Sequence, residues 1–120
     1  MAKRLLIADD HAIVRVFLSK SLEASGFELF EAANGCEAIE KAIQHNPDII
    51  ILDAVMPRMG GMQVARELRA KSISAQIVLL TCDGAEISSE EVRSADVKAV
   101  ISKTKLGEMK RRVIAFLLTS

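Results

Sequence analysis

Five residues of this 120-residue chain have side chains that could act together on a phosphoryl group. They are three carboxylates, a hydroxyl and an ammonium group, at Asp9, Asp10, Asp53, Thr81 and Lys103. Two carboxylates about 4 Å apart repel by roughly 4 kcal/mol at an effective dielectric constant near 20. A site that gathers three of them therefore needs positive charge, from Lys103 and from a cation. Ligands that are all oxygen suit Mg²⁺, which also binds phosphate oxygens.

A carboxylate can attack phosphorus and hold the product as an acyl phosphate. Phosphoryl transfer mainly requires in-line positioning and neutralisation of the phosphoryl oxygens, which a magnesium ion, a lysine and a hydroxyl provide. Considered singly, each aspartate could instead cap the helix or turn that follows it. His11 is the one candidate for a general base, but it is predicted to be a solvent-facing residue of a first helical turn. His45 is predicted to lie at a helix end, where the dipole favours it.

Five short apolar stretches predict the strands that position these side chains. The stretches are apolar on both faces, which is typical of parallel strands covered by helices on each side. They comprise residues 4–8, 28–30, 48–52, 76–80 and 99–101. Four of them run directly, or within two residues, into one of the reactive side chains. The second ends in "EAAN" without a comparable group and is predicted to be an edge strand.

The segments between these stretches have apolar residues at helical spacing. The predicted helices cover residues 12–25, the segment from Asn34 to the Asn-Pro pair at 46–47, and residues 62–70, 85–95 and 105–118. Ile13 in the first and Ile43 in the second are among the residues predicted to face inward. Gly26 is expected to end the first helix, and Asn34 with Glu37 to form a capping pair for the second.

The helix predicted at residues 85–95 has only Ile87 and Val92 as apolar anchors, so it is expected to move more easily than the others. Five strands alternating with five helices predict a doubly wound α/β fold, with helices on both faces of the sheet. Such sheets bind ligands outside the carboxyl ends of the strands, where the strand order reverses. The five reactive residues are predicted to meet at this rim.

Composition excludes several other kinds of protein. Sixteen basic and sixteen acidic residues cancel, so the chain has no overall charge suited to nucleic acid or an anionic membrane. The basic residues Lys110, Arg111 and Arg112 are predicted to form the exposed face of the last helix. Without a membrane-length apolar run or a signal segment, a cytoplasmic location is expected, with Cys36 and Cys82 as free thiols.

"DD" at 9–10, "LDxxMPxMGG" at 52–61, Thr81 and Lys103 together resemble a response-regulator receiver domain, over nearly the whole chain. The resemblance implies a flavodoxin-like strand order, 2-1-3-4-5. It also implies that Asp53 accepts a phosphoryl group from a histidine kinase or a histidine phosphotransfer protein. Mg²⁺ would be held by Asp53, by Asp10 directly, by Asp9 through water and by the backbone carbonyl of Val55. Lys103 and Thr81 would contact the phosphoryl oxygens.

By the same resemblance the chain is a signalling domain whose chemistry is its own phosphorylation and dephosphorylation. An output domain or effector protein is expected to contact residues 82–118, without direct contact to nucleic acid or membrane. Residues 1–120 are expected to form one receiver domain, alone or excised from a longer regulator.

Several positions depart from the family pattern. Val100 and Ile101 stand where an aromatic residue is usual before the lysine, and Thr104 stands where a proline usually follows it. Cys82 replaces a small residue that borders access to the site. It would either narrow the entrance for a phosphodonor or be a buried thiol without a role, and the second alternative is favoured. Val55 and Asp83 would flank the path of hydrolytic water. The hypothesis is that apolar Val55 slows loss of the phosphoryl group.

Three other functions are compatible with parts of the sequence. A small phosphatase would need a second acid two residues after Asp53, where Val55 lies. A flavin-binding module would need a phosphate-binding loop after the first strand and aromatic stacking partners, yet the chain contains neither Trp nor Tyr. A phosphorylation-independent receiver-like interaction domain is supported only by the missing aromatic residue. The complete reactive set favours the phosphorylated switch.

Overall fold

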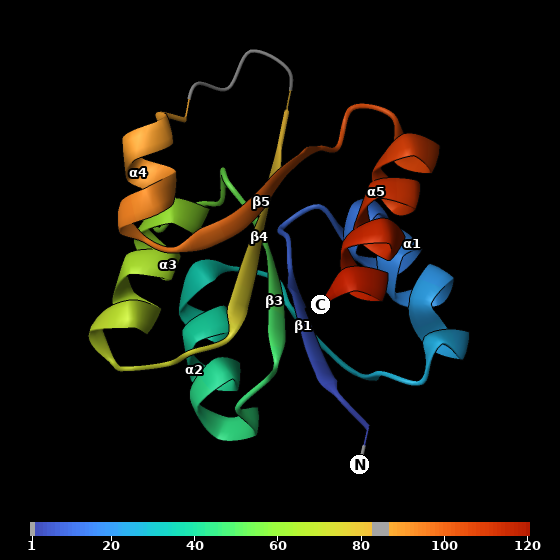
Figure 1. The fold of residues 1–120 in the computed structure, drawn as a ribbon, viewed down its shortest axis with the longest axis horizontal. Coiled ribbons are helices and arrows are strands. Elements are labelled where there is room, and N and C mark those ends of the chain that lie inside the picture. The colour runs from blue at the N-terminus through green and yellow to red at the C-terminus, as the bar shows by residue number, and fades with distance from the viewer. Residues whose placement is uncertain (1, 83–86) are drawn as a thin grey trace.

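The computed structural model describes residues 2–82 and 87–120, which form a parallel sheet between two layers of helices (Figure 1). The strands are β1 (Arg4–Ala8), β2 (Glu28–Ala32), β3 (Ile49–Asp53), β4 (Gln76–Thr81) and β5 (Val97–Ser102). All neighbouring strands pair in parallel, in the order β2-β1-β3-β4-β5. The fold class, the strand order and the position of β2 at an edge are therefore confirmed.

Helices cover both faces of the sheet, as right-handed crossovers require (Figure 1). Helices α1 (Ala12–Leu22), followed by the 3₁₀ turn η1 (Glu23–Ser25), and α5 (Leu106–Thr119) lie on one side. Helices α2 (Gly35–His45), α3 (Gly61–Ala70) and α4 (Ser89–Ser94) lie on the other. None of these helices is long and apolar enough to cross a membrane, within the residues that the structure describes.

The predicted helix ends are confirmed where capping residues define them. Gly26 follows η1 in the left-handed conformation, with φ of 87°. At the start of α2, the Asn34 side chain accepts a hydrogen bond from the Glu37 backbone N–H at 2.8 Å. The Glu37 carboxylate in turn accepts from the backbone N–H of Ala33 at 3.0 Å. These bonds satisfy N–H groups that a helix start leaves unpaired.

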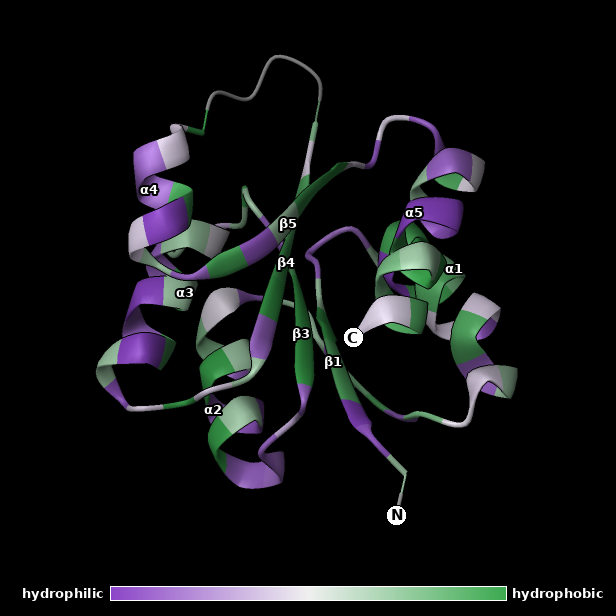
Figure 2. Ribbon diagram, in the orientation of Figure 1, coloured by the Kyte–Doolittle hydropathy of each residue, from purple (hydrophilic) through white to green (hydrophobic). Residues whose placement is uncertain are grey.

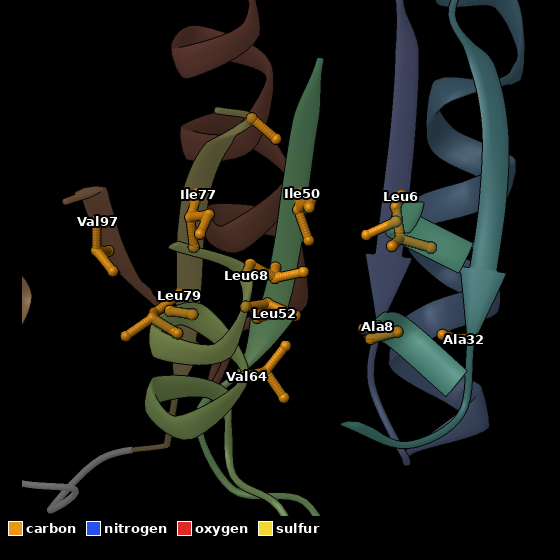
Figure 3. Close-up of a cluster of buried hydrophobic side chains, with 14 of the residues drawn as sticks. Leu6, Ala8, Ala32, Ile50, Leu52, Val64, Leu68, Ile77, Leu79 and Val97 are labelled. Carbon is orange, nitrogen blue, oxygen red and sulfur yellow. The ribbon is translucent and has the colours of Figure 1, made fainter. Parts of the chain in front are cut away.

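The central strands of the sheet are apolar and are buried on both faces. Figure 2 colours β1, β3 and β4 mainly hydrophobic, and all five residues of β3 are buried. Successive residues of a strand point to opposite faces, so Leu6 and Ile50 enter one core while Leu5 and Ile49 enter the other. Figure 3 shows the first of these cores, where Leu68 of α3 packs beside the strands. Each such side chain contributes about 1.5–3 kcal/mol when fully buried.

Two residues predicted to face inward are exposed. The side of α1 that meets the sheet is formed by Leu18 and Leu22, and Ile13 is 78% exposed. In α2 the small residues Ala38 and Ala42 are buried against the sheet, and Ile43 is 59% exposed. An apolar stripe wider than the contact area leaves its outer residues in solvent, and spacing alone does not show where the contact ends.

Helix α4 is shorter than the predicted segment. Residues 85 and 86 of that prediction lie outside the described residues, and the described helix begins only at Ser89, capped by the Ser88 hydroxyl, which accepts from the Glu91 backbone N–H at 3.0 Å. None of its six residues is buried. The thin anchoring predicted for this segment is therefore confirmed.

The end of α4 is held by a side chain from α3. The Arg69 guanidinium donates to the backbone carbonyls of Ala95 at 3.1 Å, Asp96 at 3.0 Å and Ile73 at 2.7 Å. Asp96 lies in the left-handed region, with φ of 52°, between α4 and β5. Arg69 therefore fixes the turn through which the chain leaves α4.

Candidate functional site

The structure places the five reactive residues at the carboxyl ends of four neighbouring strands. Asp9 and Asp10 follow β1, Asp53 ends β3, Thr81 ends β4 and Lys103 follows β5. In the ladders, Ala8 is opposite Leu52, Asp53 opposite Leu80, and Thr81 opposite Ser102. Because these strands are parallel and their last residues lie opposite one another, their ends form one rim of the sheet.

Lys103 lies between two buried carboxylates. Its Nζ is 2.9 Å from Asp53 Oδ2 and 3.2 Å from Asp9 Oδ2. Asp9 is fully buried, Asp53 is 1% exposed and Lys103 is 7% exposed. Buried charges of this kind are tolerated when each is paired and hydrogen-bonded. The ammonium group therefore neutralises part of the negative charge that the rim gathers.

The environment of Lys103 keeps the ammonium group charged. Burial alone would lower the pKa of Lys103, but the hydrogen bond to Asp53 and the charges of Asp9 and Asp53 outweigh burial and raise that pKa. The lysine is therefore a fixed positive charge beside the Asp53 carboxylate.

Backbone hydrogen bonds fix the positions of these side chains. The N–H of Asp9 donates to the Ala32 carbonyl at 3.1 Å, and the N–H of Lys103 donates to the Thr81 carbonyl at 2.8 Å. The Arg15 guanidinium, on α1, donates to the Asp9 carbonyl at 2.7 Å. Both backbone groups of Asp9 and the backbone N–H of Lys103 are therefore hydrogen-bonded, which favours a preorganised site.

The acidic residues form a group that could hold a cation. Asp9, Asp10, His11 and Asp53 each offer a ligand atom within 4.8 Å of the others. Asp10 Oδ1 is buried and has no hydrogen-bond partner within the described part of the chain. A buried carboxylate oxygen without a donor is unfavourable unless a cation meets it. Three carboxylates that carry hard oxygen ligands match the preference of Mg²⁺, so the residues present fit this ion.

His11 is closer to this group than the sequence analysis predicted. It is the N-cap residue of α1, and its side chain is 59% exposed, as expected for a solvent-facing residue. Its Nδ1, however, points inward and lies 3.0 Å from Lys103 Nζ and 3.7 Å from Asp53 Oδ2. The position of His11 directly after the acidic pair at a strand end was the signal that could have identified it.

Val55 contacts Asp53, and Thr81 ends the neighbouring strand β4. The Val55 N–H donates to Asp53 Oδ1 at 3.3 Å, and its side chain is 65% exposed. Thr81 is half-buried in a hollow that also includes Val92 and Val100. Val100, which borders this hollow, is 42% exposed.

The other departures from the family pattern have direct structural outcomes. Cys82 is exposed, so the prediction of a buried thiol was wrong; it follows the last residue of β4, where the chain leaves the sheet. Both cysteines are free, as predicted. The Thr104 N–H donates to the Ser102 hydroxyl at 3.3 Å, a bond that a proline could not make. Asp83 lies outside the described residues.

Comparison with known proteins agrees with this geometry. A family model described as the response regulator receiver domain matches residues 5–114. The transcriptional regulatory protein PdtaR of Mycobacterium tuberculosis is 40% identical over 102 residues, which are 84% of this chain and 49% of that protein. The chemotaxis protein CheY of Bacillus subtilis is 35% identical over 104 residues, which are 86% of this chain and 87% of that protein.

Solved structures repeat the same arrangement. The chemotaxis response regulator CheY4 of Vibrio cholerae superposes with a TM-score of 0.84 at 26% identity, covering 98% of this chain and 99% of that chain. The receiver domain of AraT, a response regulator from Geobacillus stearothermophilus, also gives 0.84, at 28% identity and with 98% and 93% covered. The chain spans about half the length of PdtaR, 49%, and most of the length of CheY. From the matched family model, the relatives and the shared fold, this chain belongs to the response-regulator receiver family.

Proposed function

We propose that the chain is the phosphoacceptor of a two-component signalling system and that Asp53 receives the phosphoryl group. One observation carries the proposal: Lys103 Nζ lies 2.9 Å from Asp53 Oδ2, at the end of a fully buried strand and beside the Asp9 carboxylate. A buried carboxylate that is held this rigidly and paired with a fixed ammonium is suited to receive a dianionic group. The phosphodonor is proposed to be a histidine kinase or a histidine phosphotransfer protein.

In the proposed transfer, an Asp53 oxygen attacks phosphorus in line with the bond to the donor nitrogen. The new P–O bond forms as the P–N bond breaks, and the donor imidazole leaves with the electron pair and takes up a proton. Lys103 stays close to Asp53 and neutralises charge on the phosphoryl oxygens. The Thr81 hydroxyl donates a hydrogen bond to one of those oxygens. No separate general base is needed, because the nucleophile is already a carboxylate.

The magnesium ion is proposed to be held by Asp9, Asp10, Asp53 and the backbone carbonyl of Val55. The buried Asp10 oxygen without a hydrogen-bond partner in the described part of the chain supports this assignment. When bound, Mg²⁺ supplies charge neutralisation for the transferring group. Asp9 and Asp10 would hold the ion beside Asp53. Asp9 is fully buried, so its carboxylate is shielded from bulk solvent.

Phosphorylation is proposed to change the surface formed by residues 82–118, which an output domain or effector protein would contact. The described residues of this surface include α4, none of whose residues is buried, so little packing opposes its displacement. Residues 1–120 are proposed to be a single receiver domain, and their match to half of PdtaR is consistent with excision from a longer regulator. A cytoplasmic location is proposed, where two exposed free cysteines would stay reduced.

The direct test is incubation with Mg²⁺ and acetyl phosphate, followed by measurement of the intact mass. The wild-type chain is expected to gain one phosphoryl group, and Asp53→Asn to gain none. Replacement of Asp10 by asparagine should lower the rate of labelling by at least about tenfold, because metal affinity depends on its oxygen. A wild-type chain that stays unlabelled under these conditions would leave only the phosphorylation-independent interaction domain.

Val55 offers a test of the lifetime of the phosphoryl group. Its exposed apolar side chain follows Asp53 by two residues and offers no hydrogen bond to an attacking water molecule. Val55→Asn is expected to speed dephosphorylation by about fivefold, because one net hydrogen bond of about 1 kcal/mol corresponds to that factor. The decay of the labelled mass after removal of acetyl phosphate measures this rate. Val55→Leu is the matched control, and equal decay rates for all three proteins would refute the hypothesis.

A further inference from the structure

His11 gives this site a nitrogen ligand in addition to its carboxylates. We propose that the His11 imidazole binds the metal ion through Nδ1 and that the site therefore selects first-row transition-metal dications, such as Mn²⁺, more strongly than an oxygen-only site would. The inference rests on the proposed metal site at Asp9, Asp10 and Asp53. It concerns which ion that site prefers.

The first argument is the position of Nδ1. It lies 3.3 Å from Asp9 Oδ1, 3.5 Å from Asp10 Oδ1 and 3.7 Å from Asp53 Oδ2, between all three carboxylates. The four ligand atoms lie within 4.8 Å of one another. Metal bonds of about 2.1 Å place opposite ligands about 4.2 Å apart, so the group needs to contract by less than about 1 Å.

The second argument is the positive charge that already lies beside Nδ1. The Lys103 ammonium is 3.0 Å from Nδ1 and is hydrogen-bonded to Asp9 and Asp53. The imidazole nitrogen and these carboxylates therefore face one positive charge together. A cation bound at Nδ1 would replace the contact of Nδ1 with Lys103 and leave the ammonium on Asp9 and Asp53.

The third argument is the way in which the backbone aims His11. Its N–H donates to Asp9 Oδ1 at 2.8 Å, and its carbonyl accepts from the Arg15 N–H in the first turn of α1. As the N-cap residue of α1 it makes no side-chain cap hydrogen bond, so the ring is not used to end the helix. The rest of the ring is exposed, which leaves space for the ion and its water ligands.

Ligand chemistry sets the expected selectivity. Imidazole suits Zn²⁺, Cu²⁺, Ni²⁺ and related ions, whereas Mg²⁺ prefers carboxylate, carbonyl and water. Every nitrogen and oxygen site favours transition metals to some degree, so the informative quantity is the change in the Mn²⁺ to Mg²⁺ affinity ratio when the imidazole is removed. Because imidazole is a poor ligand for Mg²⁺, its removal should weaken Mn²⁺ binding and leave Mg²⁺ binding nearly unchanged. Loss of a group that supports a metal site costs about 10–100-fold in affinity, so the Mn²⁺ to Mg²⁺ ratio should fall by about tenfold.

The test combines pulsed EPR of the Mn²⁺-loaded chain with calorimetric titration of Mn²⁺ and of Mg²⁺. The wild type is expected to show coupling of Mn²⁺ to an imidazole ¹⁴N. His11→Ala should lose this coupling and should retain Mg²⁺ binding. Its Mn²⁺ to Mg²⁺ affinity ratio should be about tenfold lower than that of the wild type. His45→Ala is the matched control, because the only other histidine of the sequence lies at the end of α2, stacked on Phe30.

A second variant separates folding from ligation. His11→Asn keeps a residue that is favoured at the N-cap of a helix but has no imidazole, so it should fold and should also lose the ¹⁴N coupling. Bound Mn²⁺ without ¹⁴N coupling in the wild type would overturn the inference and leave the carboxylate site intact. Absence of Mn²⁺ and Mg²⁺ binding in the wild type would instead overturn the proposed metal site itself.

Discussion

Replacing Lys103 with alanine is expected to lower the free energy of unfolding by about 3–5 kcal/mol in a buffer without divalent cations. The variant leaves Asp9 and Asp53 buried, 0% and 1% exposed, without the ammonium group that lies 3.2 and 2.9 Å from them. Two like charges in that environment repel each other and have lost their hydration. The penalty has two sources: the uncompensated carboxylates, and the loss of the lysine stem, whose side chain is only 5% exposed.

Urea unfolding followed by far-ultraviolet circular dichroism measures this effect. Tryptophan fluorescence cannot be used, because the chain contains no tryptophan. Lys105→Ala is the matched control: it removes an exposed lysine two residues away and should change stability by less than about 0.5 kcal/mol. Added Mg²⁺ should stabilise Lys103→Ala more than the wild type, because the ion takes over the neutralisation of the carboxylates. Equal stability of Lys103→Ala and Lys105→Ala would contradict the buried ion pair.

Gly61→Ala is expected to destabilise the chain by about 1–3 kcal/mol and to slow labelling of Asp53 at the same time. A Cβ at this position would lie 2.5 Å from the Asp53 carbonyl oxygen and 3.1 Å from Ala54 Cα. Neither atom can rotate away, since both belong to the backbone at the end of β3. The strand end and α3 must separate, and the Asp53 carboxylate moves with the strand end. Positioning errors of this size are costly in phosphoryl transfer.

Gly107→Ala provides the matched control for the second variant. Gly107 is exposed near the start of α5, and a Cβ there would meet nothing within 4 Å. This substitution should be neutral or should stabilise the chain by up to about 1 kcal/mol, because alanine loses less backbone entropy than glycine. Unfolding curves and acetyl phosphate labelling rates should be measured for both proteins. If Gly61→Ala shows wild-type stability and a wild-type labelling rate, the prediction is wrong, and the backbone at Asp53 and Ala54 can move away from the added Cβ without loss.

The fold was predictable because few segments of this sequence fit both a strand pattern and a helix pattern. The run at β3 is apolar on both faces and all its residues are buried, as a central parallel strand requires. Strand ends were less predictable: β2 continues to Ala32 and β5 runs from Val97 to Ser102, beyond the predicted stretches at 28–30 and 99–101. Pairing with neighbouring strands extends these elements, and that information is not local.

The rim of the sheet was predictable for a different reason. Parallel strands bring their carboxyl ends to one edge, so polar residues that follow apolar runs must lie near each other. The position of His11 after the acidic pair could have placed it near the rim, but the orientation of its ring was not predictable, because the backbone allows the ring to point either outward or toward Asp53. Exposure of Ile13 and Ile43 and of Cys82 also depended on where neighbouring elements end. These are properties of packing rather than of spacing.

The contact of Arg69 with the turn after α4 determines how that helix can be displaced. Rigid translation of α4 would break the Arg69 hydrogen bonds to the Ala95 and Asp96 carbonyls, whereas rotation about its Ala95 end would keep them. Rotation is therefore the cheaper motion, and it moves the Ser89 end furthest. Six residues make a helix about 9 Å long, so a tilt of about 20° shifts Ser89 by about 3 Å. An effector seated on the Ser89 end would sense a change that one seated near Asp96 would not.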